Sequence, residues 1–313
     1  MTMTMTNASA VCILMGTYNG EAFLADQLLS IENQSHTNWR LIISDDGSID
    51  STLTIAKSFQ DKWGSDRLEI REGPKQGFCT NFLSLACDPT IQADFYAFSD
   101  QDDVWMVDKL STALAYFNTG NNTDLARVYC GRTQIVDEKL NVLGFSPLFS
   151  LPLSFRNALM QSIAGANTMV FNQATKDLLQ KTGLLNVVSH DWWVYQIVEG
   201  VGGEIYYDPT PTLLYRQHDA IIAGSNILFL PKVNRLLRLL NGQYVTWNIM
   251  NYQALSSFNH LLSKPNQKVL LSYGQFRAAK MTNRYQLFKS CGLYRQTLLG
   301  NIALQLAVLL NKV

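Results

Sequence analysis

Short apolar segments alternate with amphipathic segments from Val11 to Phe117, and this alternation restricts the fold more than any other feature of the sequence. The apolar segments are residues 11–15, 41–43, 68–70 and 95–98. Between them, apolar side chains recur at helical spacing. Strands that are apolar on both faces and connected by helices form a parallel sheet that is covered on both sides. The pattern therefore predicts an α/β domain with a mostly parallel sheet and helices on both of its faces.

The rest of the chain is less regular. Further strands are predicted over residues 128–130, 168–171, 204–207 and 213–215, with a helix over residues 191–198. From about Asn226 the apolar spacing is helical to the end of the chain. We therefore expect two domains, an α/β domain of residues 1–225 and a helical C-terminal region of residues 226–313.

Composition excludes several classes of protein. The 313 residues include 25 basic and 25 acidic residues, so the formal net charge is zero and no global field favours nucleic acid. The five cysteines are scattered and never form Cys-x-x-Cys, which indicates neither a zinc site nor a disulfide framework. The N-terminus lacks the features of a secretory signal, and no apolar run reaches the roughly 20 residues of a membrane span. We therefore expect a cytoplasmic protein with reduced thiols.

An acidic run, Asp100 to Asp103, directly follows the apolar segment 95–98. Three carboxylates at the end of a buried strand repel one another unless a cation binds them. Hard oxygen ligands suit Mg²⁺ or Mn²⁺, and such an ion also binds the oxygens of a diphosphate. A lone Asp-x-Asp is more often a solvated loop, but Tyr18 and the pair Asp45–Asp46 fall at the same strand ends, where ligands bind in parallel sheets. The sequence therefore favours a metal and diphosphate site at this edge.

The pair Asp45–Asp46 has two interpretations. Because Asp-Gly is a strong turn signal, the pair alone indicates a capped turn. As a site, one carboxylate would accept the imide N–H of uracil or thymine, and the other would contact ribose or main chain. Gly77 would let the chain pass close to such a nucleotide, and Lys75 would offset phosphate charge.

Two segments in the second half carry further candidates. His218 follows a predicted strand and is either an ordinary residue or a metal ligand, while Arg216 would pair with diphosphate oxygens or with a carboxylate. Asp191 begins a predicted helix and is either its N-cap or a general base. Trp192 and Trp193 follow it, and because neighbouring residues point to different sides of a helix, we expect one of them to line a sugar site.

Five segments together resemble the successive motifs of the inverting family 2 glycosyltransferases. In the order of that family, they are Thr17–Gly20, Ile42–Ser48, Asp100–Trp105, His190–Trp193 and Tyr215–His218. Within the family, the chain most resembles the bacterial rhamnosyltransferase-like branch. The resemblance covers about residues 10–225 and implies a GT-A fold, which is Rossmann-like, with residues 1–225 as the nucleotide-sugar-binding and catalytic domain.

The resemblance also implies roles for individual residues. Asp45 or Asp46 would hold the base, Asp100 the ribose or the metal, and Asp102 the metal. His218 would be a further metal or phosphate contact, and Asp191 the catalytic base. The cofactor would be Mn²⁺ or Mg²⁺. The remaining donor-site residues would be Thr17, Tyr18, Lys75, Gln101 and Arg216, and the acceptor-side residues Trp192 and Trp193.

The implied reaction is a metal-dependent transfer with inversion at the anomeric carbon. We expect L-rhamnose from dTDP-L-rhamnose as the sugar and a saccharide acceptor, lipid-linked, in the synthesis of a bacterial surface polysaccharide such as O-antigen. Alternatives are a UDP-hexose-dependent transferase of the same fold, a non-catalytic sugar-nucleotide-binding subunit of an assembly complex, and a metal-dependent nucleotidyltransferase. A disused site usually loses an acid, and none of the five motifs does. A nucleotidyltransferase would carry a basic residue between Gly16 and Gly20, where this chain has none.

An apolar stripe marks the C-terminal end of the chain. It consists of Leu298, Leu299, Ile302, Leu306, Leu309 and Leu310, with Asn301, Gln305 and Lys312 opposite and Arg284, Lys289 and Arg295 upstream. Such a helix either lies on the inner face of the cytoplasmic membrane as a peripheral contact or docks on protein, and the sequence favours neither.

Overall fold

The computed structural model describes residues 9–119, 124–217 and 243–313, which divide into two compact units. The first consists of residues 1–148, 164–185 and 204–217, and the second of residues 149–163, 186–203 and 218–313. The predicted division at residue 226 differs from these units, because residues 149–163 and 186–203 pack with the C-terminal helices rather than with the sheet. Each unit is described separately below.

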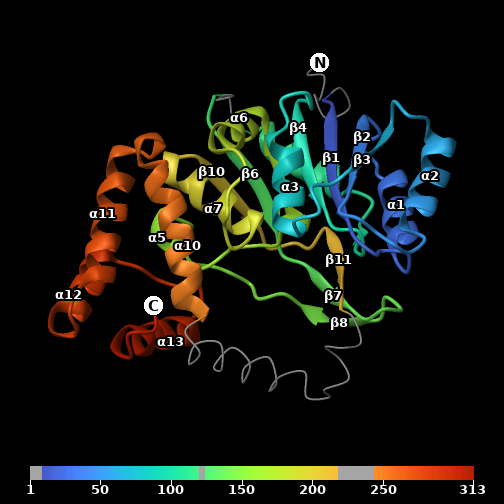
Figure 1. The fold of residues 1–313 in the computed structure, drawn as a ribbon. Helices are drawn as coiled ribbons and strands as arrows, with labels where there is room; N and C mark the ends of the chain where they lie inside the picture. Colours follow the sequence, from blue (N-terminus) through green and yellow to red (C-terminus); the bar gives the residue numbers. More distant parts are fainter. Residues whose placement is uncertain (1–8, 120–123, 218–242) are drawn as a thin grey trace. The chain divides into compact units, whose positions relative to one another are not determined.

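A seven-stranded sheet forms the centre of the first unit, with the order β10-β6-β9-β4-β1-β2-β3 (Figure 1). Strands β1 to β4 pair in parallel, as do β6 and β10, whereas β9 is antiparallel to both of its neighbours. The predicted α/β class with a mostly parallel sheet is therefore confirmed. The strands are β1 (Val11–Thr17), β2 (Trp39–Asp45), β3 (Leu68–Glu72), β4 (Phe95–Ser99), β6 (Arg127–Gly131), β9 (Val170–Asn172) and β10 (Glu204–Asp208).

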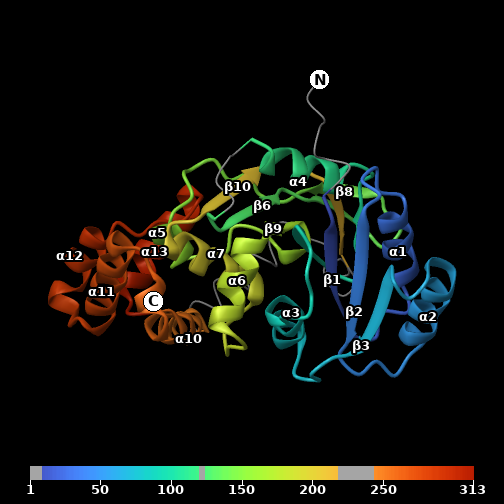
Figure 2. The ribbon, with the colours of Figure 1, turned by 90° about the horizontal axis from the view of Figure 1, so that it is seen from above.

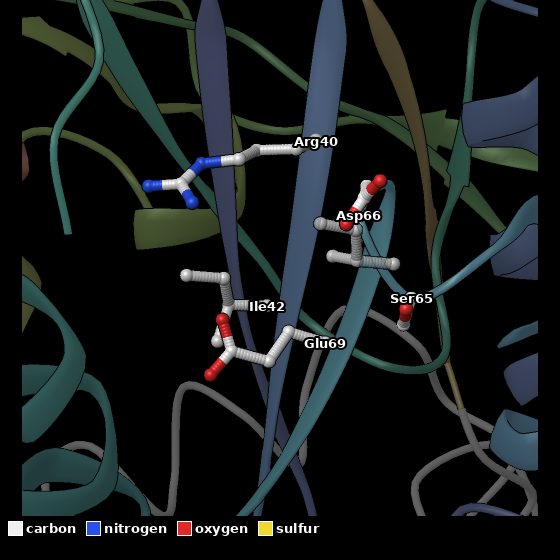
Figure 3. A pocket seen from close by; sticks show the side chains of 6 residues that line it. Arg40, Ile42, Ser65, Asp66 and Glu69 are labelled. Carbon is white, nitrogen blue, oxygen red and sulfur yellow. The ribbon is translucent and has the colours of Figure 1, made fainter.

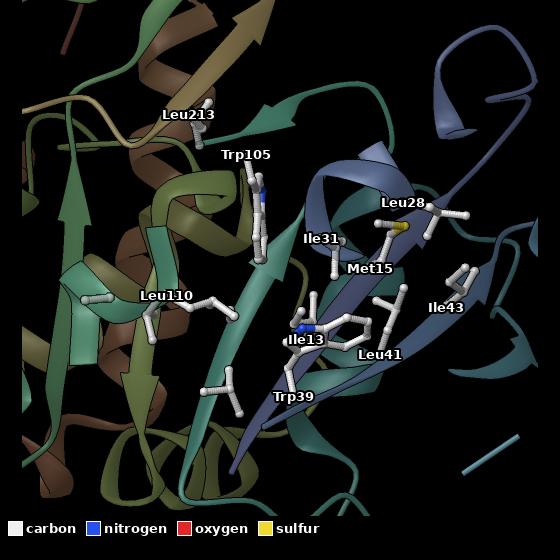
Figure 4. Packing of buried hydrophobic residues seen from close by; sticks show 14 of the residues in the cluster. Ile13, Met15, Leu28, Ile31, Trp39, Leu41, Ile43, Trp105, Leu110 and Leu213 are labelled. Carbon is white, nitrogen blue, oxygen red and sulfur yellow. The ribbon is translucent and has the colours of Figure 1, made fainter. Parts of the chain in front are cut away.

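Helices cover both faces of this sheet, as Figure 2 shows. Side chains alternate along a strand, so Ile13 and Met15 enter one core cluster while Leu14 points to the opposite face. That cluster also contains apolar side chains of the helices on its side, among them Leu28, Ile31 and Leu110 (Figure 4). The helices of this side are α1 (Leu24–Glu32), α2 (Thr52–Trp63) and α4 (Lys109–Phe117), and those of the other side are α3 (Phe78–Cys87) and α6 (Gln173–Thr182).

A second sheet of four short strands lies where the acidic run ends. Its order is β5-β11-β7-β8, with β11 antiparallel to β5 and parallel to β7. Because β5 directly follows Asp103 and pairs with β11, the small sheet brings Arg216 to the acidic run. The strands are β5 (Val104–Trp105), β7 (Gln134–Val136), β8 (Val142–Phe145) and β11 (Leu213–Arg216).

The second unit is helical within its described residues. Helix α7 (His190–Val201) packs against α5 (Phe155–Ala158), α10 (Gln243–Ser257) and α11 (Lys264–Ala278). Helix α12 (Met281–Cys291) packs against both α11 and α13 (Leu298–Leu309). Among the helices that the structure describes, none has the length and apolar character needed to cross a membrane.

Candidate functional site

The loops after β1 and β4 are joined by the side chain of Gln101. Its Oε1 accepts a hydrogen bond from the Tyr18 backbone N–H at 2.9 Å, and its Nε2 donates to the Tyr18 carbonyl at 3.0 Å. At Gly20 a Cβ atom would lie 2.3 Å from Gln101 Oε1, so a larger residue there would displace the Gln101 side chain from Tyr18. The structure therefore shows Gln101 positioning Tyr18, whose ring is exposed, and a direct contact of Gln101 with a donor stays a prediction.

Asp45 is a buried carboxylate at the end of β2 whose hydrogen bonds all come from protein. Its Oδ1 accepts from the backbone N–H groups of Gly47 and Ser48, at 3.1 and 2.8 Å. Its Oδ2 accepts from the hydroxyls of Thr17 and Ser48, at 2.9 and 2.6 Å. Four donors match the about four lone-pair positions of a carboxylate. Asp45 and Thr17 therefore build the turn after β2.

Asp46 points instead toward the loop after β3. Its Oδ1 accepts from the backbone N–H of Lys75 at 2.6 Å, and its Oδ2 from that of Gly77 at 2.8 Å. Lys75 and Gly77 both have positive φ angles, 58° and 88°, which bend this loop back toward the acid. The exposed Lys75 ammonium forms an ion pair with Glu72 at 2.5 Å. Each oxygen of Asp46 keeps an acceptor position that no described hydrogen bond uses.

The acidic run after β4 also contains one buried member, Asp103. Its Oδ2 accepts from Asn167 Nδ2 at 2.5 Å, and its Oδ1 from the Arg216 backbone N–H at 3.4 Å. Burial, with the Asp102 charge, raises the pKa of Asp103 to about 7. The fully buried Lys109 donates to the Asn167 carbonyl at 2.9 Å, and burial lowers its pKa to about 7, against the attraction of Asp103 and Asp100. Asp103 is therefore an internal anchor of the loop.

The guanidinium of Arg216 is also buried and bonded within the first unit. Its Nε donates to the Asp102 carbonyl at 2.9 Å, its Nη2 pairs with Asp26 Oδ2 at 3.0 Å, and its Nη1 donates to the Glu138 carbonyl. It also lies over the ring of Phe23, 4.4 Å from the centroid. The structure thus shows the pairing with a carboxylate, and the diphosphate contact suggested for Arg216 stays a prediction.

Asp100 and Asp102 are the members of the acidic run that remain partly exposed. Within the described ranges, no group of three or more His, Cys, Asp or Glu side chains could hold a metal ion. Two carboxylates are enough for an ion whose remaining ligands are water and the phosphates of a substrate, which is the usual coordination of Mg²⁺. The residues present therefore fit an ion shared with a diphosphate, not a cage made of protein alone. His218, the other predicted ligand, lies outside the described residues.

Asp191 belongs to the second unit, where it is the second residue of α7. Its Oδ1 accepts from the Trp192 backbone N–H at 2.7 Å, and the side chains of Ser189 and Ser162 also donate to it. Burial raises the pKa of Asp191, while these three donors oppose that rise. Ser189, not Asp191, is the N-cap residue. A partly buried carboxylate in the first helical turn is suited to be a base, because its oxygens are more basic than those of a solvated acid.

Neither tryptophan after Asp191 offers an open face within this unit. Trp192 is 6% exposed and donates from Nε1 to the Ala158 carbonyl at 2.7 Å. Trp193 is fully buried and packs edge-on against Phe258, with 6.2 Å between the ring centroids. The structure lends no support to the acceptor-side role suggested for these two residues.

Several residues that shape the site were absent from the sequence candidates. Asn81 of α3 holds the end of β2, because its Nδ2 donates to the Ser44 carbonyl at 2.8 Å and its Oδ1 accepts from the Ser44 hydroxyl at 2.5 Å. Asn167 holds Asp103, and Lys109 in turn holds Asn167, as described above. A buried amide or lysine carries no local pattern, so the sequence signal for these residues was limited to a polar side chain within an apolar segment.

A cavity of about 230 Å³ lies at another edge of the sheet (Figure 3). Its polar lining consists of Arg40, Ser65, Asp66 and Glu69, from the first half of β2, the turn before β3 and the start of β3. In parallel strands these positions lie at the amino ends. The cavity is therefore separate from the loops that carry Asp46, Asp100 and Asp102.

Comparison with known proteins identifies relatives of this chain. A family model described as Glycosyl transferase family 2 matches residues 12–179. The chain is 32% identical over 289 residues to the dTDP-rhamnosyl transferase RfbG of Shigella flexneri, covering 87% of this chain and 97% of that protein.

Two solved structures are similar in fold. S. aureus TarS, residues 1–349, in complex with UDP-GlcNAc, has a TM-score of 0.53 at 16% identity, over 90% of this chain and 79% of that one. The mannosyltransferase PcManGT from Pyrobaculum calidifontis, in complex with GDP-Man and Mn²⁺, has a TM-score of 0.50 at 13% identity, over 97% and 86%. Together with the family match and the strand-end loops described above, these similarities show that the chain belongs to glycosyl transferase family 2, with a GT-A fold and a rhamnosyltransferase-like sequence.

Proposed function

We propose that this protein transfers L-rhamnose from dTDP-L-rhamnose to a saccharide acceptor and inverts the anomeric configuration. The observation that carries the proposal is the 32% identity to a dTDP-rhamnosyl transferase, which extends over 97% of that relative. The loops after β2 and β4 supply the acidic side chains that such a donor needs, and the loop after the neighbouring β1 supplies Tyr18 at the same edge of the sheet.

Thymine would bind beside Asp46 and the exposed ring of Tyr18. Asp45 already accepts four hydrogen bonds, so of these two acids it is Asp46 that keeps acceptor positions for the imide N–H of the base. The ring of Tyr18 stays at the mouth of the site because Gln101 fixes its backbone. Lys75, next to Asp46, would offset phosphate charge.

The diphosphate would lie next to Asp100 and Asp102, and these two carboxylates would hold a divalent ion, with His218 as a further candidate ligand. When bound, Mg²⁺ or Mn²⁺ would offset the charge that develops on the departing dTDP. The PcManGT complex with GDP-Man and Mn²⁺ supports a metal of this kind for the fold. Asp103 and Arg216 would fix the loop that carries the metal ligands Asp100 and Asp102.

Asp191 would act as the general base. Its carboxylate takes the proton of an acceptor hydroxyl while that oxygen attacks the anomeric carbon. The bond from the anomeric carbon to the diphosphate oxygen breaks as the new bond forms, and its electron pair leaves with dTDP. Because attack comes from the face opposite the leaving group, a β-linked donor yields an α-rhamnoside without a covalent intermediate.

The acceptor would be a lipid-linked saccharide in the synthesis of a bacterial surface polysaccharide such as O-antigen, and the protein would work at the cytoplasmic face of the membrane as a peripheral protein. A UDP-hexose donor is the second candidate, because the structurally similar TarS was solved with UDP-GlcNAc. A non-catalytic binding subunit is disfavoured, because the acids at positions 46, 100, 102 and 191 are all present.

A donor panel tests the proposal. The purified chain is incubated with dTDP-L-rhamnose, UDP-glucose and UDP-GlcNAc, with Mg²⁺ or Mn²⁺, and release of the nucleoside diphosphate is measured. We expect release from dTDP-L-rhamnose at the highest rate, and release at least about a hundredfold slower from the Asp102→Asn variant. Faster release from a UDP-sugar would replace the rhamnosyl assignment by a hexosyl one. Donor binding without release in any condition would favour the binding subunit.

A further inference from the structure

The predicted apolar stripe near the C-terminus is exposed in the structure. Six large apolar side chains of α13 and its C-terminal end are each between 47% and 78% accessible, and they recur along one side of the helix: Leu298, Leu299, Ile302, Leu306, Leu309 and Leu310. We call this set the leucine face. Single exposed leucines are common on protein surfaces, but six on one helix form a patch, and such patches mark interaction sites.

The opposite side of α13 is fixed to the second unit. Leu304, Ala307 and Val308 are buried there. Beyond the helix, the Val313 carbonyl accepts a hydrogen bond from Arg284 of α12 at 3.1 Å. Before it, the buried side chain of Gln296 donates to the Leu151 carbonyl at 3.1 Å. Because both ends and one side of α13 are held in this way, the leucine face cannot turn inward without breaking these contacts.

The charge of the chain is strongly divided along the sequence. All 25 acidic residues lie within the first 219 positions, and the segment from Ala220 to Val313 contains none. The same segment contains 11 of the 25 lysine and arginine residues. The zero net charge of the chain is therefore the sum of a net negative charge on residues 1–219 and a net positive charge on residues 220–313. Exposed lysines of the basic part lie on α11 and at the two ends of α12: Lys264, Lys268, Lys280 and Lys289.

We propose that the leucine face and the acid-free basic segment dock the protein on the surface of an anionic phospholipid bilayer. The 12 residues of α13 extend over about 18 Å, which is too short for the roughly 30 Å hydrocarbon core, so the helix lies along the interface. Leucines would enter the boundary between headgroups and acyl chains, and lysines would attract anionic lipid. An anionic bilayer thus provides an apolar region for the leucines and negative charge for the lysines.

A second copy of the chain fits this surface less well. A symmetric dimer places the same patch of both copies face to face. Here that arrangement would bring two basic segments together, and neither contains an Asp or Glu side chain that could compensate the repulsion. An anionic bilayer has the opposite charge and an apolar interior. The charge pattern therefore decides between the two occupants.

The inference rests on the proposed function only for its purpose, which is to bring the catalytic domain to a lipid-linked acceptor. Binding and transfer are separate measurements. The test measures how the full chain partitions onto vesicles of phosphatidylcholine alone and onto vesicles with about one third phosphatidylglycerol. The test variant combines Leu299→Glu and Leu306→Glu. The matched control is Leu271→Glu, which changes a leucine of α11 that is 63% exposed and lies outside the leucine face.

We expect the wild type to bind the anionic vesicles, and the double variant to bind them at least about tenfold more weakly. The control variant should stay within about twofold of the wild type. Raising NaCl from about 0.1 M to about 0.5 M should weaken wild-type binding, because salt screens the lysines. Thermal unfolding should be unchanged in both variants, because all three leucines are exposed.

Three outcomes would overturn the proposal: a wild type that stays in solution with anionic vesicles, equal binding to neutral and anionic vesicles, or a double variant that binds like the wild type. A wild-type dimer that the double variant converts to a monomer in sedimentation would assign the leucine face to a second copy instead. Vesicle binding without turnover of dTDP-L-rhamnose would leave the docking intact and contradict only the proposed donor.

Discussion

The loops after β2 and β4 each combine a buried acid with a partly exposed one, but they hold the buried acid in different ways. Asp45 receives four neutral donors, three of them from the two residues Gly47 and Ser48 of its own turn. Asp103 accepts from Asn167, which lies 64 residues away and whose carbonyl accepts from the buried Lys109. The first loop is therefore stabilised locally, and the second depends on the folded sheet. In both loops we assign a structural role to the buried carboxylate, which leaves its less buried neighbour for chemistry.

Asp191 is an exception to this division between structural and chemical acids. Its replacement should cause the largest loss of turnover. It accepts protein donors, as Asp45 does, yet we assign it a chemical role. Asp191→Asn keeps the size and one acceptor oxygen but removes the basic one. We expect turnover to fall by roughly two to four orders of magnitude, with donor affinity and thermal stability near the wild type. Turnover and donor binding are measured on the same preparation. Near-native turnover would make Asp191 structural, like Asp45.

The exposed acid of the β4 loop should give the next largest effect. Asp102→Asn removes one charge from the proposed metal ligands, and we expect a loss of turnover of about a hundred- to a thousandfold, the range seen when one preorganised electrostatic group is removed. Thermal stability should change little, because Asp102 is partly exposed. EDTA should abolish turnover by the wild type, and added Mn²⁺ or Mg²⁺ should restore that turnover. Full activity in EDTA would remove the metal from the proposal.

The buried acid of the same loop should affect folding instead. Asp103→Ala leaves the buried Asn167 side-chain amide without its acceptor, and an unsatisfied buried polar group costs about 1–3 kcal/mol of the free energy of unfolding. Urea unfolding measures this loss, with Asp102→Ala as the matched control that changes the neighbouring, partly exposed acid. A loss no larger than that of the control would show that the loop does not depend on Asp103.

Of the two acids after β2, Asp46 should affect donor binding and Asp45 should affect stability, and neither effect should exceed its counterpart in the β4 loop. Asp46→Asn should raise the KM for dTDP-L-rhamnose by about ten- to a hundredfold, because a hydrogen bond to a charged group is worth about 1.5–3 kcal/mol. Asp45→Asn should lower the free energy of unfolding by about 1–3 kcal/mol, since it leaves buried donors without an acceptor. Kinetics and unfolding are measured for both variants. If Asp45→Asn changed only KM, the two assignments would have to be exchanged.

The smallest effect near neutral pH should be a pH dependence of stability that originates at His190. Burial lowers its pKa to about 3, from an ordinary 6.5, so the folded chain keeps the imidazole neutral. Between these two values the unfolded chain binds more protons, and the stability that is fully present above pH 6.5 is lost as the pH falls, by up to about 1.4 kcal/mol per pH unit. Thermal unfolding at several pH values should show a shallower slope for His190→Gln. An unchanged slope would rule out this origin.

The main strands of the large sheet could be predicted from the sequence, whereas most of the contacts that organise the site could not. The apolar segments at 11–15, 41–43, 68–70 and 95–98 correspond to β1 to β4, because burial on both faces leaves a continuous apolar run. Three strands of the small sheet were not predicted. Strands β5, β7 and β8 have two, three and four residues, which is too few to show an alternation of apolar and polar side chains. The second unit also includes residues 149–163 and 186–203, and their association with the C-terminal helices is long-range.

The candidate residues show the same limit. Their positions at strand ends followed from topology, but whether Asp45 or Asp46 is buried depends on donors supplied by Thr17 and by the loop after β3. Arg216 and Gln101 were predicted to contact a donor, and the structure shows both bonded to neighbouring loops. Such partners are set by the tertiary fold, which a motif does not encode.

The position of β9 has a consequence for synthesis of the chain on the ribosome. This strand fills the gap between β4 and β6, although some forty residues separate the end of β6 from its start. Until β9 emerges, β4 has a partner on only one side, and β6 has none, because its other neighbour β10 is made later still. Unpaired strand edges of this kind attract other chains. A nascent chain that stalls between β6 and β9 therefore exposes strand edges that are paired in the complete sheet.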